Sequence, residues 1–264
     1  MSTTSTPIEH RAIPGLGWII PIVLLVLLVV AWEIAVRLSQ TPAWILPPPS
    51  KISAALADNW RVLLHHSWVT LEETLIGLGL SFACGVATAT VIASSRSIER
   101  SVYPIVVASQ AIPIIALAPI LLIWFGYGLA PKVIVILLFC FFPITVNTID
   151  GFRAVDQEQV DLLRSLGASR WFILRTVRLP SALPYVLSGT RIAAAVSVVG
   201  ALVGEWVGSS AGLGYYMIRS ASAFATDKVF AAILITAVIG IALFLSVTLL
   251  ERLLMPWQRV SEKA

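Results

Sequence analysis

Charged residues are scarce in this chain: Asp, Glu, Lys and Arg make up 12% of its 264 residues, whereas 58% are hydrophobic. A soluble globular domain usually carries about twice that charged fraction. The composition therefore excludes an ordinary soluble domain and predicts an all-α, polytopic membrane protein. At roughly 20 residues per apolar span, about six transmembrane helices fit into this length.

Cysteine and histidine are also rare, with two and three copies respectively. Cys84 and Cys140 lie in apolar segments, where a cysteine usually packs as a small hydrophobic residue. We therefore expect no disulfide, no metal site and no bound cofactor. The sequence also has no GxxxxGK[ST] phosphate loop, so it should neither bind nor hydrolyse ATP. No basic cluster interleaved with aromatic residues indicates a nucleic-acid surface.

Long apolar runs are the main feature that is present. They predict spans near residues 18–38, 69–93, 102–125, 131–149, 185–204 and 229–250. Together these spans form one transmembrane domain, 18–250, between a polar N-terminal tail, 1–17, and a basic C-terminal tail, 251–264. The span 185–204 is rich in Ala, Gly, Ser and Val, which predicts a tightly packed central helix.

The predicted third span contains three prolines and one strongly polar side chain, Gln110. Breaks in a membrane helix are tolerated where neighbouring helices or a water-filled cavity satisfy the freed backbone groups. We therefore expect this span to face the protein interior, and Gln110 is a pathway candidate. Glu72 and Glu73 lie at the outer end of the second span, where we interpret them as interfacial carboxylates, with a pathway role as the alternative.

Three consecutive prolines precede Ser50, and they cannot continue a helix. Ser50 is the predicted N-cap of a short amphipathic helix, 51–65, that lies at the membrane interface.

Positive charge indicates which loops face the cytoplasm. With six spans and both termini inside, eleven Lys and Arg residues fall in cytoplasmic pieces and six in outer pieces; Arg191 lies within a span. This bias predicts a multi-pass protein of the cell (inner) membrane with both termini in the cytoplasm. The charged loop 150–184 then also faces the cytoplasm.

That loop contains the most informative stretch, 161–180, which reads DLLRSLGASRWFILRTVRLP. Apolar residues alternate there with charged ones, which predicts an amphipathic helix with an Asp161–Arg164 pair on its surface. Gly167 suits a left-handed helix end, and a second short helix could cover 169–178. Such a helix–glycine–helix loop with exposed apolar residues indicates a docking element for a partner protein.

The stretch resembles the loop that defines the permease subunits of bacterial ATP-binding-cassette (ABC) importers. The family pattern is Glu-Ala-Ala, three residues, Gly, nine residues, Ile, any residue, Leu-Pro. The matching positions here are Asp161, Leu162, Leu163, Gly167, Val177, Leu179 and Pro180. The opening triplet departs from the pattern, with Asp for Glu and Leu for both Ala, but the register is intact. Resemblance to the nitrate/sulfonate/taurine branch extends roughly from Leu46 to Trp257.

This resemblance implies a type I ABC importer permease fold and a non-catalytic subunit. The expected partners are cytoplasmic ABC ATPase subunits, a second permease copy that completes a homodimeric pore, an extracytoplasmic solute-binding protein and the lipid bilayer. The predicted ATPase-docking residues are Asp161, Leu162, Leu163, Leu166, Gly167, Ala168, Leu179 and Pro180. The alternative is a solvated loop whose charges only set the topology.

The stretch 204–216, GEWVGSSAGLGYY, follows the predicted fifth span. A carboxylate near the membrane usually faces a cavity or a partner, and in the resembled family this region lies at the external gate. Glu205 and Trp206 are therefore gate or pathway candidates, with a structural ion pair and interfacial packing as the alternative. Residues 208–212 also match GxSxG, so an intramembrane serine hydrolase using Ser210 is a second hypothesis. A stand-alone secondary transporter is a third, but no inverted repeat is evident.

The outer stretch and the last span look like the subgroup that imports flat heterocyclic vitamins or their precursors, such as the pyrimidine part of thiamine or riboflavin. A carboxylate with Trp206, Tyr215 and Tyr216 nearby suits neutral or cationic heterocycles. Nitrate, sulfonates and taurine remain the alternative solutes, although their anionic groups favour basic contacts.

Overall fold

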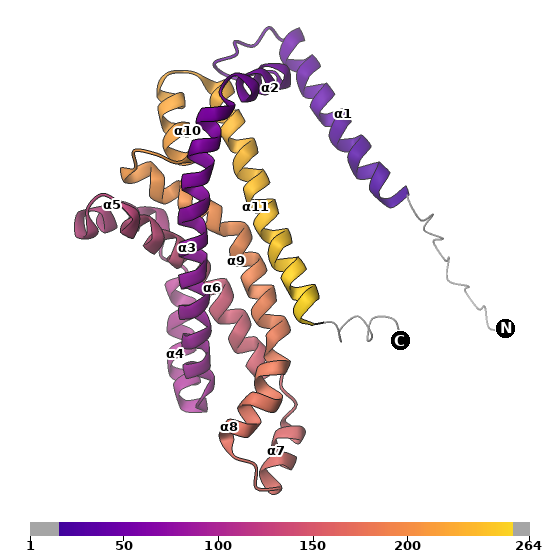
Figure 1. The fold of residues 1–264 in the computed structure, drawn as a ribbon, viewed down its shortest axis with the longest axis vertical. Coiled ribbons are helices and arrows are strands. Elements are labelled where there is room, and N and C mark those ends of the chain that lie inside the picture. The colour runs from indigo at the N-terminus through magenta and orange to yellow at the C-terminus, as the bar shows by residue number, and fades with distance from the viewer. Residues whose placement is uncertain (1–15, 256–264) are drawn as a thin grey trace, which may run out of the picture.

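Helices account for all the regular secondary structure in residues 16–255, the part of the chain that the computed structural model describes (Figure 1). The helices are α1 Leu16–Leu38, α2 Pro49–Asp58, α3 Trp60–Ala93, α4 Arg96–Ser109, α5 Ile114–Phe125, α6 Leu129–Arg153, α7 Gln157–Ser165, α8 Arg170–Ile173, the π-helical turn η1 Leu174–Arg178, α9 Leu179–Gly208, α10 Leu213–Ser222 and α11 Thr226–Leu254. Residues 1–15 and 256–264, which make up most of the two predicted tails, lie outside the described part of the chain.

The helices α3, α6, α9 and α11 form the body of the protein (Figure 1). α6 and α9 pack together at its centre, because small residues on α9 let the two backbones approach. A Cβ atom at Gly200 would lie 3.1 Å from the Cα of Ile136, and one at Gly204 would lie 3.0 Å from the Cα of Lys132. Small residues stabilise helix pairs in membranes through such close packing. The prediction of a tightly packed central helix is therefore confirmed.

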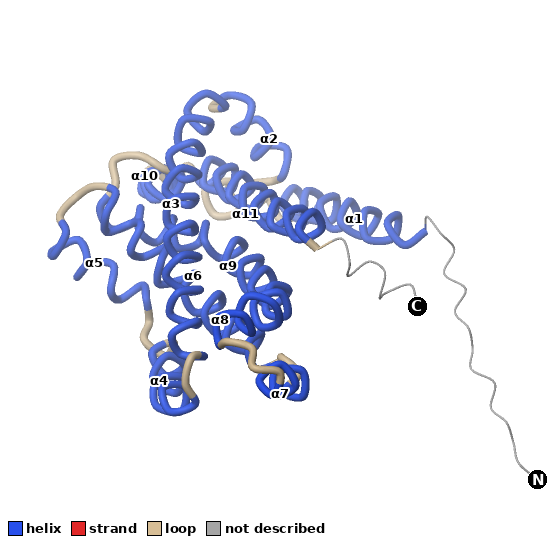
Figure 2. Tube along the Cα trace, turned by 60° about the horizontal axis from the view of Figure 1, so that its bottom comes forward, coloured by secondary structure: helices blue, strands red, loops and turns tan. Residues whose placement is uncertain are grey.

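The two ends of the body carry different short elements. α7 and α8 lie at one end, whereas α2 and α10 lie at the other, and the two views of the chain agree on this (Figure 2). α1 leans away from the body, and α5 projects from the side of the body.

The predicted third span, 102–125, is not one straight helix. α4 ends at Ser109, α5 begins at Ile114, and the two helices are bent by 92° at the break. Pro113 directly precedes α5, and a proline disfavours the helical conformation of the residue before it. Five of the described helices are long and apolar enough to cross a membrane, or six if the bent pair counts as one span.

The predicted interfacial helix, 51–65, has the wrong bounds. α2 ends at Asp58, and α3 starts at Trp60 and continues for 34 residues. Ser50 lies inside the first turn of α2 and is not its N-cap. Its backbone N–H and its hydroxyl donate instead to Glu33 of α1, at 3.0 and 2.8 Å. Pro49 takes the first helical position, where its missing N–H leaves no helical bond unmade.

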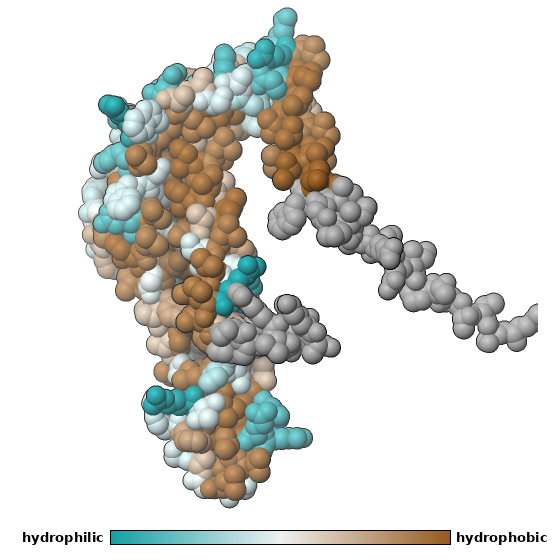
Figure 3. Space-filling model, turned by 45° about the vertical axis from the view of Figure 1, so that its right-hand side comes forward, coloured by the Kyte–Doolittle hydropathy of each residue, from teal (hydrophilic) through white to brown (hydrophobic). Residues whose placement is uncertain are grey.

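Apolar side chains cover the outside of the body and of α1. Figure 3 shows this brown surface between more hydrophilic ends. Only 6% of the most apolar window of α1, and none of that of α11, is buried inside the protein. Such large exposed apolar surfaces on helices are stable only in contact with lipid or another protein. The predicted all-α, polytopic membrane fold is confirmed.

Candidate functional site

The first candidate site is α7 with the turn that follows it. Asp156 caps α7, because its carboxylate accepts the N–H of Glu158 at 2.9 Å. Gly167 has a φ of +80°, and its N–H donates to the carbonyl of Arg164 at 3.0 Å. A left-handed φ favours glycine, which explains why the helix ends here. The predicted helix and its glycine end are confirmed.

The second predicted helix of this loop, 169–178, is not a separate element. α8 passes into the π-helical turn η1, and η1 passes into α9 without a break. Pro180 accounts for the widened turn, because it has no N–H and its ring clashes with the carbonyl of Thr176 in a regular helix. The central helix α9 is therefore continuous with the predicted docking segment.

One face of α7 is open to solvent. Leu162 and Leu166 are 61% and 74% exposed, and Asp161 and Gly167 are exposed beside them. Asp161 pairs with Arg164 at 3.1 Å, as predicted. Two exposed leucines on a short polar helix form a small apolar surface that a partner can cover. We call Asp161, Leu162, Leu166 and Gly167, the exposed members of the predicted docking residues on this side of the loop, the docking face.

The remaining predicted docking residues have a different place. Leu163 and Ala168 are partly buried, and they pack under α7 against Val155, Val160 and Ile173. Leu179 and Pro180 lie in the first turn of α9. The structure therefore assigns the first pair to supporting the docking face and the second pair to the base of the central helix.

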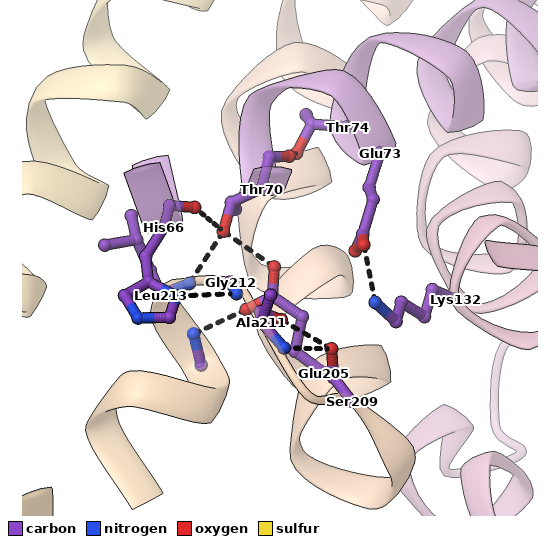
Figure 4. A network of polar contacts seen from close by, with 11 residues as sticks. His66, Thr70, Glu73, Thr74, Lys132, Glu205, Ser209, Ala211, Gly212 and Leu213 are labelled. Atoms are coloured by element: carbon purple, nitrogen blue, oxygen red, sulfur yellow. Dashed lines mark hydrogen bonds and ion pairs between the residues drawn. The ribbon is translucent and has the colours of Figure 1, made fainter. Parts of the chain in front are cut away.

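The second candidate site lies at the opposite end of the body, where α9 turns into α10 (Figure 4). Glu205 is 1% exposed, and its oxygens accept the hydroxyl of Thr70 at 2.6 Å and the N–H of Gly214 at 2.5 Å. Thr70 accepts the N–H of Leu213 at 2.8 Å, and Nδ1 of His66 accepts the N–H of Gly212 at 3.0 Å. We call these six residues the α3–α9 polar cluster; it ties the turn to α3.

Gly212 is required by the geometry of this cluster. Its φ is +110°, and a Cβ atom at this position would overlap the carboxylate of Glu205. A side chain is thus excluded both by the backbone conformation and by the space.

A buried ion pair lies next to the polar cluster. Nζ of Lys132 on α6 is 2.5 Å from a carboxylate oxygen of Glu73 on α3, and the two residues are 8% and 4% exposed. The interpretation of Glu73 as an interfacial carboxylate is therefore wrong, because Glu73 points into the body. Lys132 also lines an open cavity of about 440 Å³ with Tyr127 and Gly208.

The three predicted pathway residues are not brought together. Glu205 is buried and holds its partners by hydrogen bonds, whereas the next residue, Trp206, is 46% exposed. Gln110 is exposed and lies at the bend between α4 and α5.

Sequence reasoning missed His66, Thr70 and Lys132. Positions 66, 70 and 73 lie on one face of a helix, because they are four and three residues apart. Polar residues repeated on one face of a largely apolar helix were the signal that could have indicated a buried polar site.

The surroundings of Ser210 do not form a hydrolase nucleophile turn. That turn follows a strand, whereas residue 208 here ends the helix α9. The neighbouring hydroxyl of Ser209 is bonded to the backbone of Ala211, and Nδ1 of His66 is occupied by the N–H of Gly212.

The comparison with known families gives a direct result. Residues 76–256 match the family described as the binding-protein-dependent transport system inner membrane component. The chain belongs to this family. It is therefore an ABC transporter permease, a membrane subunit without a catalytic role of its own, and the predicted family is confirmed.

Curated relatives cover nearly the whole permease. It is 41% identical to a probable ABC transporter permease protein of Haemophilus influenzae, over 86% of this chain and 93% of the relative. It is 40% identical to the formylaminopyrimidine transport permease ThiX of Halalkalibacterium halodurans, over 90% and 96%. It is 37% identical to the riboflavin transport permease RibX of Chloroflexus aurantiacus, over 93% and 91%.

The fold agrees with a solved transporter. An inward-facing structure of the MetNI methionine ABC transporter matches with a TM-score of 0.57 and 22% identity. The match covers 71% of this chain and 97% of that chain. At this identity the likeness concerns the fold, and it agrees with the predicted importer permease architecture.

Proposed function

We propose that the permease imports a small flat heterocycle, a vitamin or vitamin precursor such as the pyrimidine part of thiamine or riboflavin. The observation that carries this substrate class is the similarity to permeases named for formylaminopyrimidine and riboflavin, at 40% and 37% identity over 90% and 93% of the chain. The alternative solutes are nitrate, sulfonates and taurine.

The proposed transporter contains two copies of the permease, cytoplasmic ABC ATPases and an extracytoplasmic solute-binding protein. The docking face supports the ATPase partner, because burying one exposed leucine contributes roughly 1.5–3 kcal/mol to binding. Asp161 and Arg164 flank this apolar surface and add polar contacts at its rim.

The docking face lies in the cytoplasm in this proposal. Two spans, α9 and α11, follow α7, so the C-terminus returns to the same side of the membrane. If the bent pair α4–α5 counts as one span, four spans precede α7, and the N-terminus also lies in the cytoplasm.

In this proposal the central helix α9 transmits a movement of α7 to the opposite end of the protein. The cluster beneath α7 contains Val155, just after α6, and Val177, just before α9. α9 then continues for 30 residues, about 45 Å at 1.5 Å per residue, to the region of Glu205. A shift of α7 driven by ATP binding would thus reach the turn between α9 and α10, which serves as the outer gate.

Uptake by reconstituted vesicles tests this proposal. The permease, its ATPase and its binding protein are combined in proteoliposomes, and accumulation of labelled riboflavin, formylaminopyrimidine, taurine and nitrate is measured. We expect ATP-dependent accumulation of one heterocycle and none without the ATPase. Accumulation that persists without the ATPase would refute the coupling, and accumulation of taurine or nitrate alone would refute the substrate class.

A further inference from the structure

A cavity of about 480 Å³ opens at the α7 end of the body, between α3, α6 and the α8–η1 segment. Its lining includes three arginines, Arg164, Arg170 and Arg178, together with the apolar side chains of Phe152 and Ile173. It is therefore a basic cavity with an apolar wall. It lies at the opposite end of the body from the polar cluster and is separate from the exposed leucines of the docking face.

A second cavity, of about 360 Å³, adjoins the first and shares Phe152 and Arg178 with it. Arg96, Arg100 and Arg153 also line this second cavity. Its carboxylate, Glu99, is already bound to Arg153 at 2.6 Å. Six arginines thus surround the two cavities, and the sole carboxylate among the lining residues is already paired.

Two of the three arginines that line the first cavity have no acidic partner. Arg164 is paired with Asp161, but within residues 16–255 neither Arg170 nor Arg178 forms an ion pair. The Nε atom of Arg178 is also buried without a hydrogen-bond acceptor. A buried donor left without a partner costs about 1–3 kcal/mol, and more when it is charged. An acceptor that binds from outside would remove this cost.

We propose that the cavity binds a phosphate group through Arg170 and Arg178. The planar guanidinium carries parallel N–H donors that match two phosphate oxygens, which makes arginine well suited to phosphate recognition. The neighbouring Trp171 and Phe172 are 67% and 49% exposed, and such aromatic residues are typical of the membrane–water boundary. A phospholipid headgroup can therefore supply the phosphate, and a soluble phosphate is the second source of the same chemistry.

Direct binding to the full-length chain tests this proposal. The permease is purified in a neutral detergent and titrated with labelled phosphatidylglycerol in mixed micelles, and separately with labelled inorganic phosphate. The variants are R170Q and R178Q. The matched control is R175Q, which removes the same charge from an exposed position that does not line the cavity. Thermal unfolding of each variant reports whether the fold is kept.

We expect R170Q and R178Q each to weaken phosphatidylglycerol binding by about tenfold or more, as for the loss of a charge-assisted hydrogen bond, and R175Q to leave it unchanged. The same pattern with inorganic phosphate, but not with the lipid, would also support the site and would identify a soluble ligand. Equal losses in all three variants, or binding independent of both arginines, would overturn it. Arg170 is exposed, so R170Q decides the question even if R178Q fails to fold.

Discussion

Thr70 on α3 donates a hydrogen bond of 2.6 Å to Glu205 on α9, although 135 positions separate the two residues in the sequence. The same pair also accepts the N–H groups of Leu213 and Gly214, so it holds the turn between α9 and α10 against α3. The position of this turn therefore depends on two of the main helices at once. A gate at this place would open when α9 shifts relative to α3.

Replacing Glu205 should destabilise the permease. E205A leaves the buried N–H of Gly214 without its acceptor, at about 1–3 kcal/mol. It also removes the shorter of two bonds from the hydroxyl of Thr70, which keeps the carbonyl of His66 as an acceptor at 3.1 Å. We expect a lower unfolding temperature in detergent and a loss of ATP-dependent uptake. W206A is the control for the unfolding temperature, because Trp206 is half-exposed at the adjacent position. Stability equal to wild type in E205A would contradict the role of this carboxylate.

Gly212 should not tolerate a side chain. In G212A the new Cβ overlaps the Glu205 carboxylate, and the positive φ adds strain of about 1–3 kcal/mol. Gly79 on α3 is a matched control, because a Cβ there meets no atom within 4 Å. We expect G79A to keep or slightly raise the unfolding temperature, as usual for Gly→Ala inside a helix. If G79A and G212A lower it equally, the cluster does not constrain Gly212.

The pair Glu73–Lys132 should show strong coupling. Removing one member leaves the other charge buried, which costs roughly 3–5 kcal/mol, whereas two neutral residues of similar size avoid that cost. We therefore expect E73Q and K132M to be unstable singly and the double variant to recover most of the loss. Unfolding free energies from a double-mutant cycle measure this. Additive losses would show that the two side chains act independently.

A substitution on the docking face should weaken ATPase binding without changing the stability of the permease. L166S removes an exposed apolar contact without opening the cluster beneath α7, so the unfolding temperature should stay unchanged. Binding of the ATPase should weaken by roughly 1.5–3 kcal/mol, the contribution of one buried leucine. The control is L129S. Leu129 is half-exposed at the start of α6, whereas α7 follows the other end of α6. Equal ATPase affinity in wild type and L166S would exclude this face as the docking site.

Ser210 should be dispensable. It is exposed, and its neighbours do not provide the strand–turn–helix setting of a hydrolase nucleophile. S210A should therefore keep the wild-type uptake rate in proteoliposomes. A complete loss of activity in a folded S210A protein would revive the hydrolase hypothesis.

Local features could be predicted from the sequence because they depend on neighbouring residues. Long apolar runs located the membrane-spanning helices, and the residues up to Gly167 predicted the helix α7 and its glycine end. A glycine at the end of α7 is needed for a left-handed φ, which is a property of the chain within a few residues. Even the break in the third span was marked by its prolines, although its angle of 92° was not.

The pairing of polar groups was decided by the tertiary structure. Glu73 was expected at the interface, yet it is buried against Lys132, and Thr70 was not recognised as the partner of Glu205. The reason is physical: a helix in lipid can be apolar on every side, so hydrophobicity does not tell which face is turned inward. The sequence alone determined that this chain crosses a membrane, and it predicted the docking loop. Which polar side chains meet inside it depended on how the helices rotate and pack, since buried polar groups must find partners on other helices.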